Sequence, residues 1–168
     1  IESSCLDVLL LQQPLIGDDM PFVTGSFRIV SDLSHIDGMT RDASFLVSEV
    51  PKKATSKFTS EFTQMADATA RMVEKAIDAF CNSDVSAAQE VIQDDAAVNL
   101  IYGDVTEKLV AQIREGKSSA RYLPEVLMVA KYFERIGDLA KRIASWAIFR
   151  VTGEHVTEKG VDPIPTDD

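Results

Sequence analysis

Cysteine and histidine are scarce in this sequence, with two residues of each. Cys5 and Cys81 are far apart and form no CxxC pair or Cys/His cluster. A domain held together by disulfides, or built around a zinc ion, needs more of these residue types at closer spacing. We therefore expect two small, buried, free thiols in a protein from a reducing compartment.

Basic residues and long apolar runs are also lacking. Lysine and arginine number 17 against 27 acidic residues, a formal charge of -10, so the average field repels nucleic acid and anionic lipid. No apolar run reaches the roughly 18 residues of a membrane-spanning helix, and no signal peptide is visible. We expect a cytoplasmic protein. The chain begins without Met, on a segment with the spacing of a helix interior, so we also expect residues upstream of Ile1.

Sequence motifs of catalysis are missing as well. The chain has no GxSxG, no P-loop, no dinucleotide fingerprint and no HExxH. No stretch alternates with period two for long enough to predict a strand. We therefore expect a protein without enzymatic activity and without a β-sheet.

What the sequence does contain is apolar spacing of three and four residues, typical of helices that pack in a bundle. The expected helices cover residues 1–13, 21–50, 58–82, 84–115 and 121–152. A polar connection at 51–57 offers Thr55 or Ser56 as a helix cap, Asp84 offers another, and Gly153 is a helix-ending residue. The predicted fold class is all-α, with short turns that make neighbouring helices antiparallel.

The last of these helices carries an acidic pair beside its apolar stripe. That stripe is expected at the following positions: Val126, Val129, Phe133, Ile136, Ala140, Ile143, Ala147 and Val151. Glu134 and Asp138 lie four residues apart, so their side chains are neighbours that repel each other unless a cation intervenes. The cation could be Lys131, Lys141 or Arg142, or it could be a metal ion.

A second polar pair lies in the preceding helix. Asp95 and Asn99 fall on the apolar stripe of residues 84–115, where polar groups are costly without partners. An antiparallel neighbour could bring this pair to Glu134 and Asp138 and create an oxygen-rich metal site. Alternatively, Asp95 accepts a bond from a lysine or arginine of the last helix and Asn99 bonds across the bundle.

Two segments of the chain are similar to each other. Residues 29–47 and 129–147 align at a separation of 100 residues and share one apolar stripe, which indicates a duplicated helical unit. The acids are not duplicated, because Ser34 aligns with Glu134 and Gly38 with Asp138.

The sequence resembles the PhoU family of phosphate-signalling regulators from Ile1 to about His155. The motifs that carry the resemblance are LQQP at 11–14, Ser31-Asp32-Leu33, ERIGD at 134–138, VTGE at 151–154 and the helix segment Val91–Tyr102. The resemblance implies tandem three-helix bundles related by pseudo-twofold symmetry. The polar connection at 51–57 then separates a partial first repeat at 1–50, incomplete at its N-terminus, from a second repeat at 51–155. Residues 156–168 are acidic, contain Pro and Gly and lack apolar periodicity, so we expect a disordered tail.

The resemblance also implies divalent metal or iron ions at the second-repeat motif, with Glu134, Asp138, Asp95 and Asn99 as ligands. Two departures remove ligands: Asn99 replaces an acid, and Arg142 replaces an asparagine and could neutralise Asp138. The first repeat has lost both motif acids. A weaker, mixed site there would use His35, Asp32 and Asp37.

The function implied by the resemblance is negative regulation of phosphate uptake and of phosphate-starvation signalling. The family's proteins act as dimeric, membrane-peripheral adaptors between the phosphate ABC transporter, through its ATPase subunit, and a sensor histidine kinase. A regulatory module of another ion transporter is the first alternative. A metal-carboxylate bundle enzyme is the second; such enzymes use paired Glu-x-x-His motifs, and neither histidine here has a Glu at that spacing.

Overall fold

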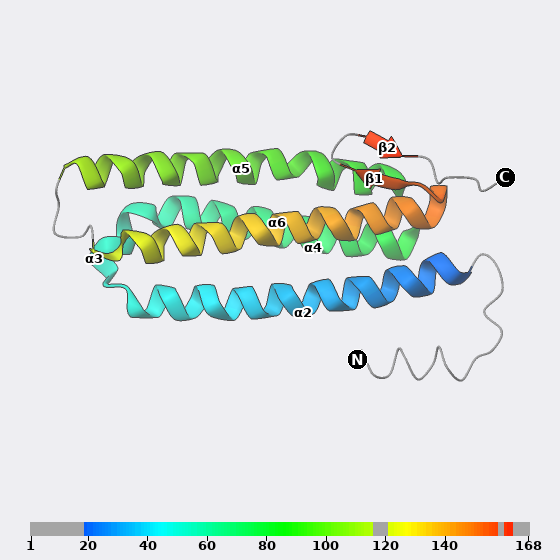
Figure 1. Ribbon diagram of the computed structural model, residues 1–168, viewed down its shortest axis with the longest axis horizontal. Helices are drawn as coiled ribbons and strands as arrows, with labels where there is room; N and C mark the ends of the chain where they lie inside the picture. The colour runs from blue at the N-terminus through cyan, green and yellow to red at the C-terminus, as the bar shows by residue number, and fades with distance from the viewer. Residues whose placement is uncertain (1–18, 116–120, 158–159, 163–168) are drawn as a thin grey trace.

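The computed structural model describes residues 19–115, 121–157 and 160–162. Four long helices lie side by side along one axis: α2 (Asp19–Glu49), α4 (Thr59–Asn82), α5 (Val85–Arg114) and α6 (Leu123–Thr152) (Figure 1). A short helix, α3 (Lys52–Thr55), and a 3-10 turn, η1 (Ser56–Phe58), connect α2 to α4. The predicted all-α class is confirmed. The helix predicted at 1–13 lies outside the described residues.

Local sequence signals set most of the helix ends. Asp84 caps α5 by accepting a hydrogen bond from the backbone N–H of Ala87 at 2.9 Å. Ser83 ends α4 with a left-handed φ of 57°, and Gly153 ends α6 with a φ of 73°. The cap predicted at Thr55 or Ser56 was wrong. Helix α4 follows Phe58 without a side-chain cap, because the hydroxyls of Thr55 and Ser56 donate to backbone carbonyls three residues earlier instead of accepting from the start of α4.

Helix α6 is the central element of the bundle. It contacts α2, α4 and α5, whereas α2 lies on the side away from α5 (Figure 1). Its fully buried alanines explain how three neighbours can approach one helix; they are Ala130, Ala140, Ala144 and Ala147. Small side chains let helix axes come close, so apolar area is buried on several faces rather than along one stripe.

Most of the stripe predicted for α6 is buried, including Val126, Ile136 and Ile143. Phe133 is partly buried, and Val151 is exposed. Val151 is 50% exposed in the last turn, where the neighbouring Arg150 makes the contacts with Phe22 of α2 and Phe80 of α4. The shared stripe places its counterparts 100 residues earlier in α2, and of these Ile29 and Ala43 are buried, but Thr40 and Val47 are exposed. Helix α2 contacts mainly α6, so its buried strip is narrower than that of a fully surrounded helix.

Helices α4, α5 and α6 pack pairwise into a three-helix unit within 51–155, the range predicted for the second repeat. The boundary predicted after residue 50 falls at the bend between α2 and α3. The assignment of 1–50 to a partial first repeat stays a prediction.

The end of the described chain differs from the expectation of no sheet, and residues 156–157 and 160–162 of the predicted disordered tail are strands; residues 158–159 and 163–168 lie outside the described residues. β1 (His155–Thr157) and β2 (Gly160–Asp162) form an antiparallel pair in which Val156 faces Val161. β1 contacts α6, and Val156 packs against the core. Strands of three residues are too short to produce a detectable alternation, and packing on α6 supplies the missing stabilisation.

One thiol also differs from expectation. Cys81 is free, as predicted, but it is exposed rather than buried. It occupies the last turn of α4, where the neighbouring Phe80 takes the inward position. Cys5 lies outside the described residues.

Candidate functional site

The contact between α5 and α6 holds three of the predicted site residues around one ammonium group. Lys141 of α6 places Nζ 2.8 Å from Asp95 Oδ2 and 2.9 Å from Asp138 Oδ1. Asn99 donates from Nδ2 to Asp95 Oδ2 at 2.8 Å. Lys141 therefore bridges an acid of α5 and an acid of its own helix. Of the two interpretations left open for Asp95, the bond from a basic residue of the last helix describes this geometry. The expectation that Asn99 bonds across the bundle was wrong, because its amide reaches Asp95 four residues earlier on the same helix.

Asp95 is deeply placed in this contact. Its side chain is only 6% exposed, and its Oδ1 has no hydrogen-bond partner among the described residues. Gly137 makes the approach possible, since a Cβ at that position would lie 2.9 Å from Asp95 Oδ1. A buried carboxylate is costly without a counter-charge, so the ammonium of Lys141 is required for the stability of this contact.

Burial of the Lys141 ammonium lowers its pKa, but the hydrogen bonds to Asp95 and Asp138 outweigh that effect and leave the pKa raised. Lys141 therefore stays protonated at neutral pH. The structure keeps a permanent positive charge between the two carboxylates.

Glu134 has a cation of its own. Lys131, three residues earlier, places Nζ 2.6 Å from Glu134 Oε2, and this contact raises the pKa of the lysine. The same ammonium lies 5.4 Å from the ring centroid of Tyr102. The repulsion expected between Glu134 and Asp138 is thus relieved by two lysines, one beside each acid.

Arg142 is engaged on the other side of α6. Its guanidinium binds Asp32 of α2 through two hydrogen bonds, of which Nε to Oδ2 measures 2.8 Å. The side chain of Asp32 is 6% exposed, whereas that of Arg142 is 53% exposed. The suggestion that Arg142 neutralises Asp138 was therefore wrong, because the guanidinium points toward α2 and Lys141 takes that role.

The weaker candidates, in the segment predicted as the first repeat, are not gathered into one site. Asp32 is turned inward to Arg142, while His35 is exposed. Asp37 pairs with Arg41 at 2.8 Å, and both side chains are largely in solvent. Ion pairs of this exposed kind contribute little to stability.

These contacts bear on the predicted metal centre. A metal ion needs several converging oxygen or nitrogen lone pairs, yet Asn99 presents a donor and Asp95 and Asp138 meet on an ammonium. Within residues 19–115, 121–157 and 160–162, no group of three or more His, Cys, Asp or Glu side chains is placed to hold a metal ion. Metal binding at Glu134, Asp138, Asp95 and Asn99, or at His35, Asp32 and Asp37, stays a prediction, and the side chains present do not fit it.

Two hollows flank the paired acids. One, of about 750 Å³, lies along α5 and α6 and is lined by Asp95, Asn99, Lys141 and Trp146, with Val156 from β1. The other, of about 630 Å³, lies between α2 and α6 and includes His35, Asp138 and Arg142. The paired charges around Lys141 and Arg142 therefore separate two solvent-accessible grooves on either side of α6.

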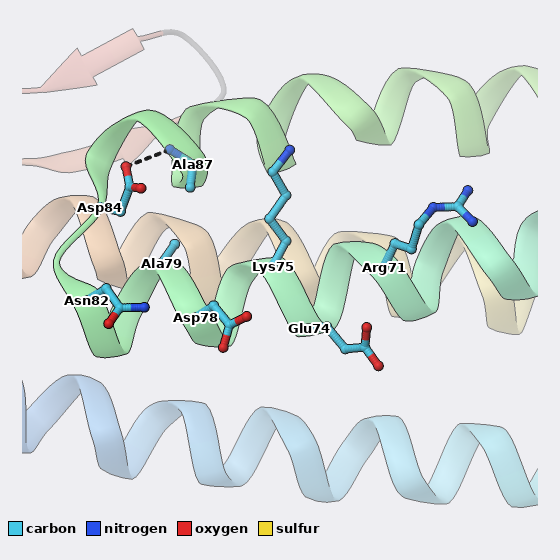
Figure 2. A pocket seen from close by; sticks show the side chains of 8 residues that line it. All are labelled: Arg71, Glu74, Lys75, Asp78, Ala79, Asn82, Asp84 and Ala87. Carbon is cyan, nitrogen blue, oxygen red and sulfur yellow. Dashed lines mark hydrogen bonds between the residues drawn. The ribbon is translucent and has the colours of Figure 1, made fainter.

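A third hollow, of about 360 Å³, lies between α4 and α5. Figure 2 shows Lys75 reaching from α4 toward α5, with Asp84 capping the neighbouring helix. Lys75 binds Glu90 at 2.7 Å and Asp94 at 3.4 Å. The lining of this hollow mixes charges of both signs, and Lys75 is already paired. The hollow therefore presents no binding surface of a single charge sign.

One buried acid was not singled out from the sequence. Glu61 of α4 is paired with Lys108 of α5, and the bond to this lysine lowers its pKa. A signal was present, because Glu61 lies three and four residues from the apolar positions Phe58 and Met65 and so falls on the inward face.

Within the described residues, no helix is long and apolar enough to cross a membrane.

Comparison with known proteins agrees with this architecture. Residues 62–147 match the model of the PhoU domain. A phosphate-specific transport system accessory protein PhoU homolog of Clostridium acetobutylicum is 26% identical over 156 residues, covering 93% of this chain and 71% of the relative. A PhoU homolog 1 of the same description, from Methanothermobacter thermautotrophicus, is 28% identical over 161 residues, covering 92% of this chain and 70% of the relative.

Solved structures show the same fold. The crystal structure of PhoU from Pseudomonas aeruginosa superposes with a TM-score of 0.75 at 25% identity, covering 90% of this chain and 73% of that one. The phosphate transport system regulatory protein PhoU from Streptococcus pneumoniae gives a TM-score of 0.82 at 20% identity, covering 93% and 72%. The match runs from α4 into α6 and covers more than half of the chain. The chain therefore belongs to the PhoU family.

Proposed function

We propose that this protein is a non-enzymatic regulator of phosphate uptake that acts by binding other proteins. The observation that carries the proposal is the match of residues 62–147 to the PhoU domain. It is supported by relatives whose names describe accessory proteins of the phosphate-specific transport system and which align over most of the chain.

The physical means of regulation would be the outer faces of the long helices. Several large apolar side chains are exposed there; the three most exposed are Leu100 at 72%, Phe45 at 64% and Ile113 at 59%. They lie on α2 and α5, which Figure 1 shows on opposite sides of α6. Exposed apolar side chains on rigid helices are suited to pack against a partner.

In more detail, we propose a cytoplasmic adaptor, acting as a homodimer, that contacts the ATPase subunit of a phosphate ABC transporter and a sensor histidine kinase. It would meet the membrane only through these partners. Phosphate supply would shift these associations, and in phosphate-replete cells the bound state would restrain both uptake and the starvation response.

Affinity capture of the tagged protein from phosphate-replete source cells tests the proposal. We expect the transporter ATPase and the kinase in the eluate, and less of each from starved cells. The same capture is repeated with Leu100→Asp and Leu100→Ala. We expect Leu100→Asp to recover less of the partners than Leu100→Ala, because a charge opposes apolar packing more strongly than a truncation does. Deletion of the gene should raise phosphate uptake and starvation-gene expression in rich medium. Recovery of a different ion transporter, with phosphate uptake unchanged by deletion, would contradict the proposal.

A further inference from the structure

The cation at the α5–α6 contact is part of the chain itself. The ammonium of Lys141 contacts Asp95 Oδ2 and Asp138 Oδ1 at 2.8 and 2.9 Å, distances of strong charge-assisted hydrogen bonds. Asp138 and Lys141 are three residues apart on α6, while Asp95 comes from α5. One ammonium therefore neutralises an acid on each of the two helices.

The surrounding groups complete a site for an ammonium rather than for a metal ion. Asn99 must present its amide nitrogen to Asp95, because a carboxylate can only accept; its oxygen is turned away as a result. Glu134, the remaining predicted ligand, pairs with Lys131 at 2.6 Å. Each of the four predicted ligand side chains thus has a partner within the chain, through an atom other than the unpartnered Asp95 Oδ1.

The fit is also steric. The carboxylate of Asp95 lies against the bare backbone of Gly137, and its side chain is 6% exposed. A divalent ion entering here would meet Lys141, whose positive charge repels it at contact distance. Entry would require the lysine to swing out and leave its two carboxylates.

We propose that Lys141 replaces a metal ion in the second repeat, so that a tethered ammonium performs the charge neutralisation for which the sequence predicts a bound cation. The packing of α5 on α6 is then independent of metal supply and insensitive to chelators. This inference concerns the site alone and does not depend on which partners the protein regulates.

Metal binding by wild-type protein is the direct test. The full chain is dialysed against Mn²⁺ and, anaerobically, against Fe²⁺, and the bound metal is measured by elemental analysis. We expect much less than one ion per chain and the same unfolding temperature with Mn²⁺ or with EDTA. One ion per chain that is lost in Asp95→Asn or Asp138→Asn would overturn the proposal.

Lys141→Met provides the complementary test, since it keeps the aliphatic stem and removes the charge. We expect a lower unfolding temperature that Mn²⁺ partly restores, because Asp95 and Asp138 then face each other without a cation. Lys131→Met is the control, and Mn²⁺ should leave its unfolding temperature unchanged. A Lys141→Met protein as stable as wild type would contradict the proposed role. If that variant does not fold, the wild-type dialysis still decides the question.

Discussion

Two consecutive basic residues of α6 bind acids on different neighbouring helices. Lys141 binds Asp95 of α5, and Arg142 binds Asp32 of α2. Both aspartates are 4% exposed as whole residues, so each is a buried acid that needs a counter-charge. The difference lies in their other contacts: Asp95 also accepts a bond from Asn99, whereas Arg142 supplies both bonds that the structure gives to Asp32 among the described residues. A buried charge with one partner should be the more vulnerable of the two.

Replacing each of the two basic residues by methionine should give the largest difference in stability between the two contacts. We expect Arg142→Met to lower the free energy of unfolding by about 2–3 kcal/mol, below the full cost for a buried pair because Arg142 is half exposed. Lys141→Met should cost less, about 1–2 kcal/mol, because Asp95 keeps its bond from Asn99. Urea unfolding of both variants measures the order. Adding Asp32→Asn should recover part of the Arg142→Met loss, and a larger loss for Lys141→Met would contradict the comparison.

Gly137 of α6 provides a second test of the contact between Asp95 and Lys141. An alanine Cβ would lie 2.9 Å from Asp95 Oδ1, so the carboxylate would have to shift away from its bonds. We expect Gly137→Ala to destabilise the protein by about 1–2 kcal/mol. Gly103→Ala is the control on α5, where a Cβ meets nothing within 4 Å. In that variant, the higher helix propensity of alanine should raise the free energy of unfolding by up to about 1 kcal/mol. Equal effects in the two thermal unfolding experiments would show that Gly137 has no role in the contact.

A third buried acid, Glu61 of α4, pairs with Lys108 of α5. This pair tests whether a buried acid outside the contacts of α6 also depends on its counter-charge for stability. The hydrogen bond from Lys108 lowers the pKa of Glu61 from its ordinary 4.5. The pair therefore stabilises the fold above that pH, and this stability is lost as the pH falls through the lowered pKa. We expect Glu61→Gln to cost about 1 kcal/mol at neutral pH and progressively less in acid. Thermal unfolding against pH, with Glu74→Gln as the exposed control, measures this; a constant difference would contradict it.

The smallest effect is expected where both charges lie in solvent. Asp37 and Arg41 form an ion pair at 2.8 Å, but their side chains are 67% and 74% exposed. Asp37→Asn should change the free energy of unfolding by no more than about 0.5 kcal/mol. Denaturant unfolding in low and high salt checks this, and a loss comparable to that of Arg142→Met would show that burial is not what separates these pairs.

The helices and their inward faces could be predicted because they depend on spacing within the chain. The cap at Asp84, the end at Gly153 and the burial of Ile136 and Ile143 all follow from neighbours within a few residues. The ion pairs could be predicted only as a set of alternatives. Lys131, Lys141 and Arg142 are all within one turn of the acids, and spacing does not say which neighbouring helix each will face.

Contacts between distant residues were beyond such reasoning. Asp32 and Arg142 are 110 residues apart, and their pairing depends on how α2 is rotated against α6. The pairing of β1 with β2 was missed for a related reason, since three-residue strands depend on packing against α6 rather than on their own pattern. The metal prediction drew on family motifs, which specify the acids but not that Lys141 would lie between two of them.

The bare backbone at Gly137 carries an evolutionary consequence. Position 95 can hold a carboxylate in its present rotamer only while position 137 has no side chain, since a methyl group there would overlap Oδ1. When relatives are aligned, the two columns should covary: descendants that acquire alanine or serine at position 137 should carry a shorter or neutral residue at position 95. The lysine at position 141 would then keep only Asp138 as a partner and should be replaced more often.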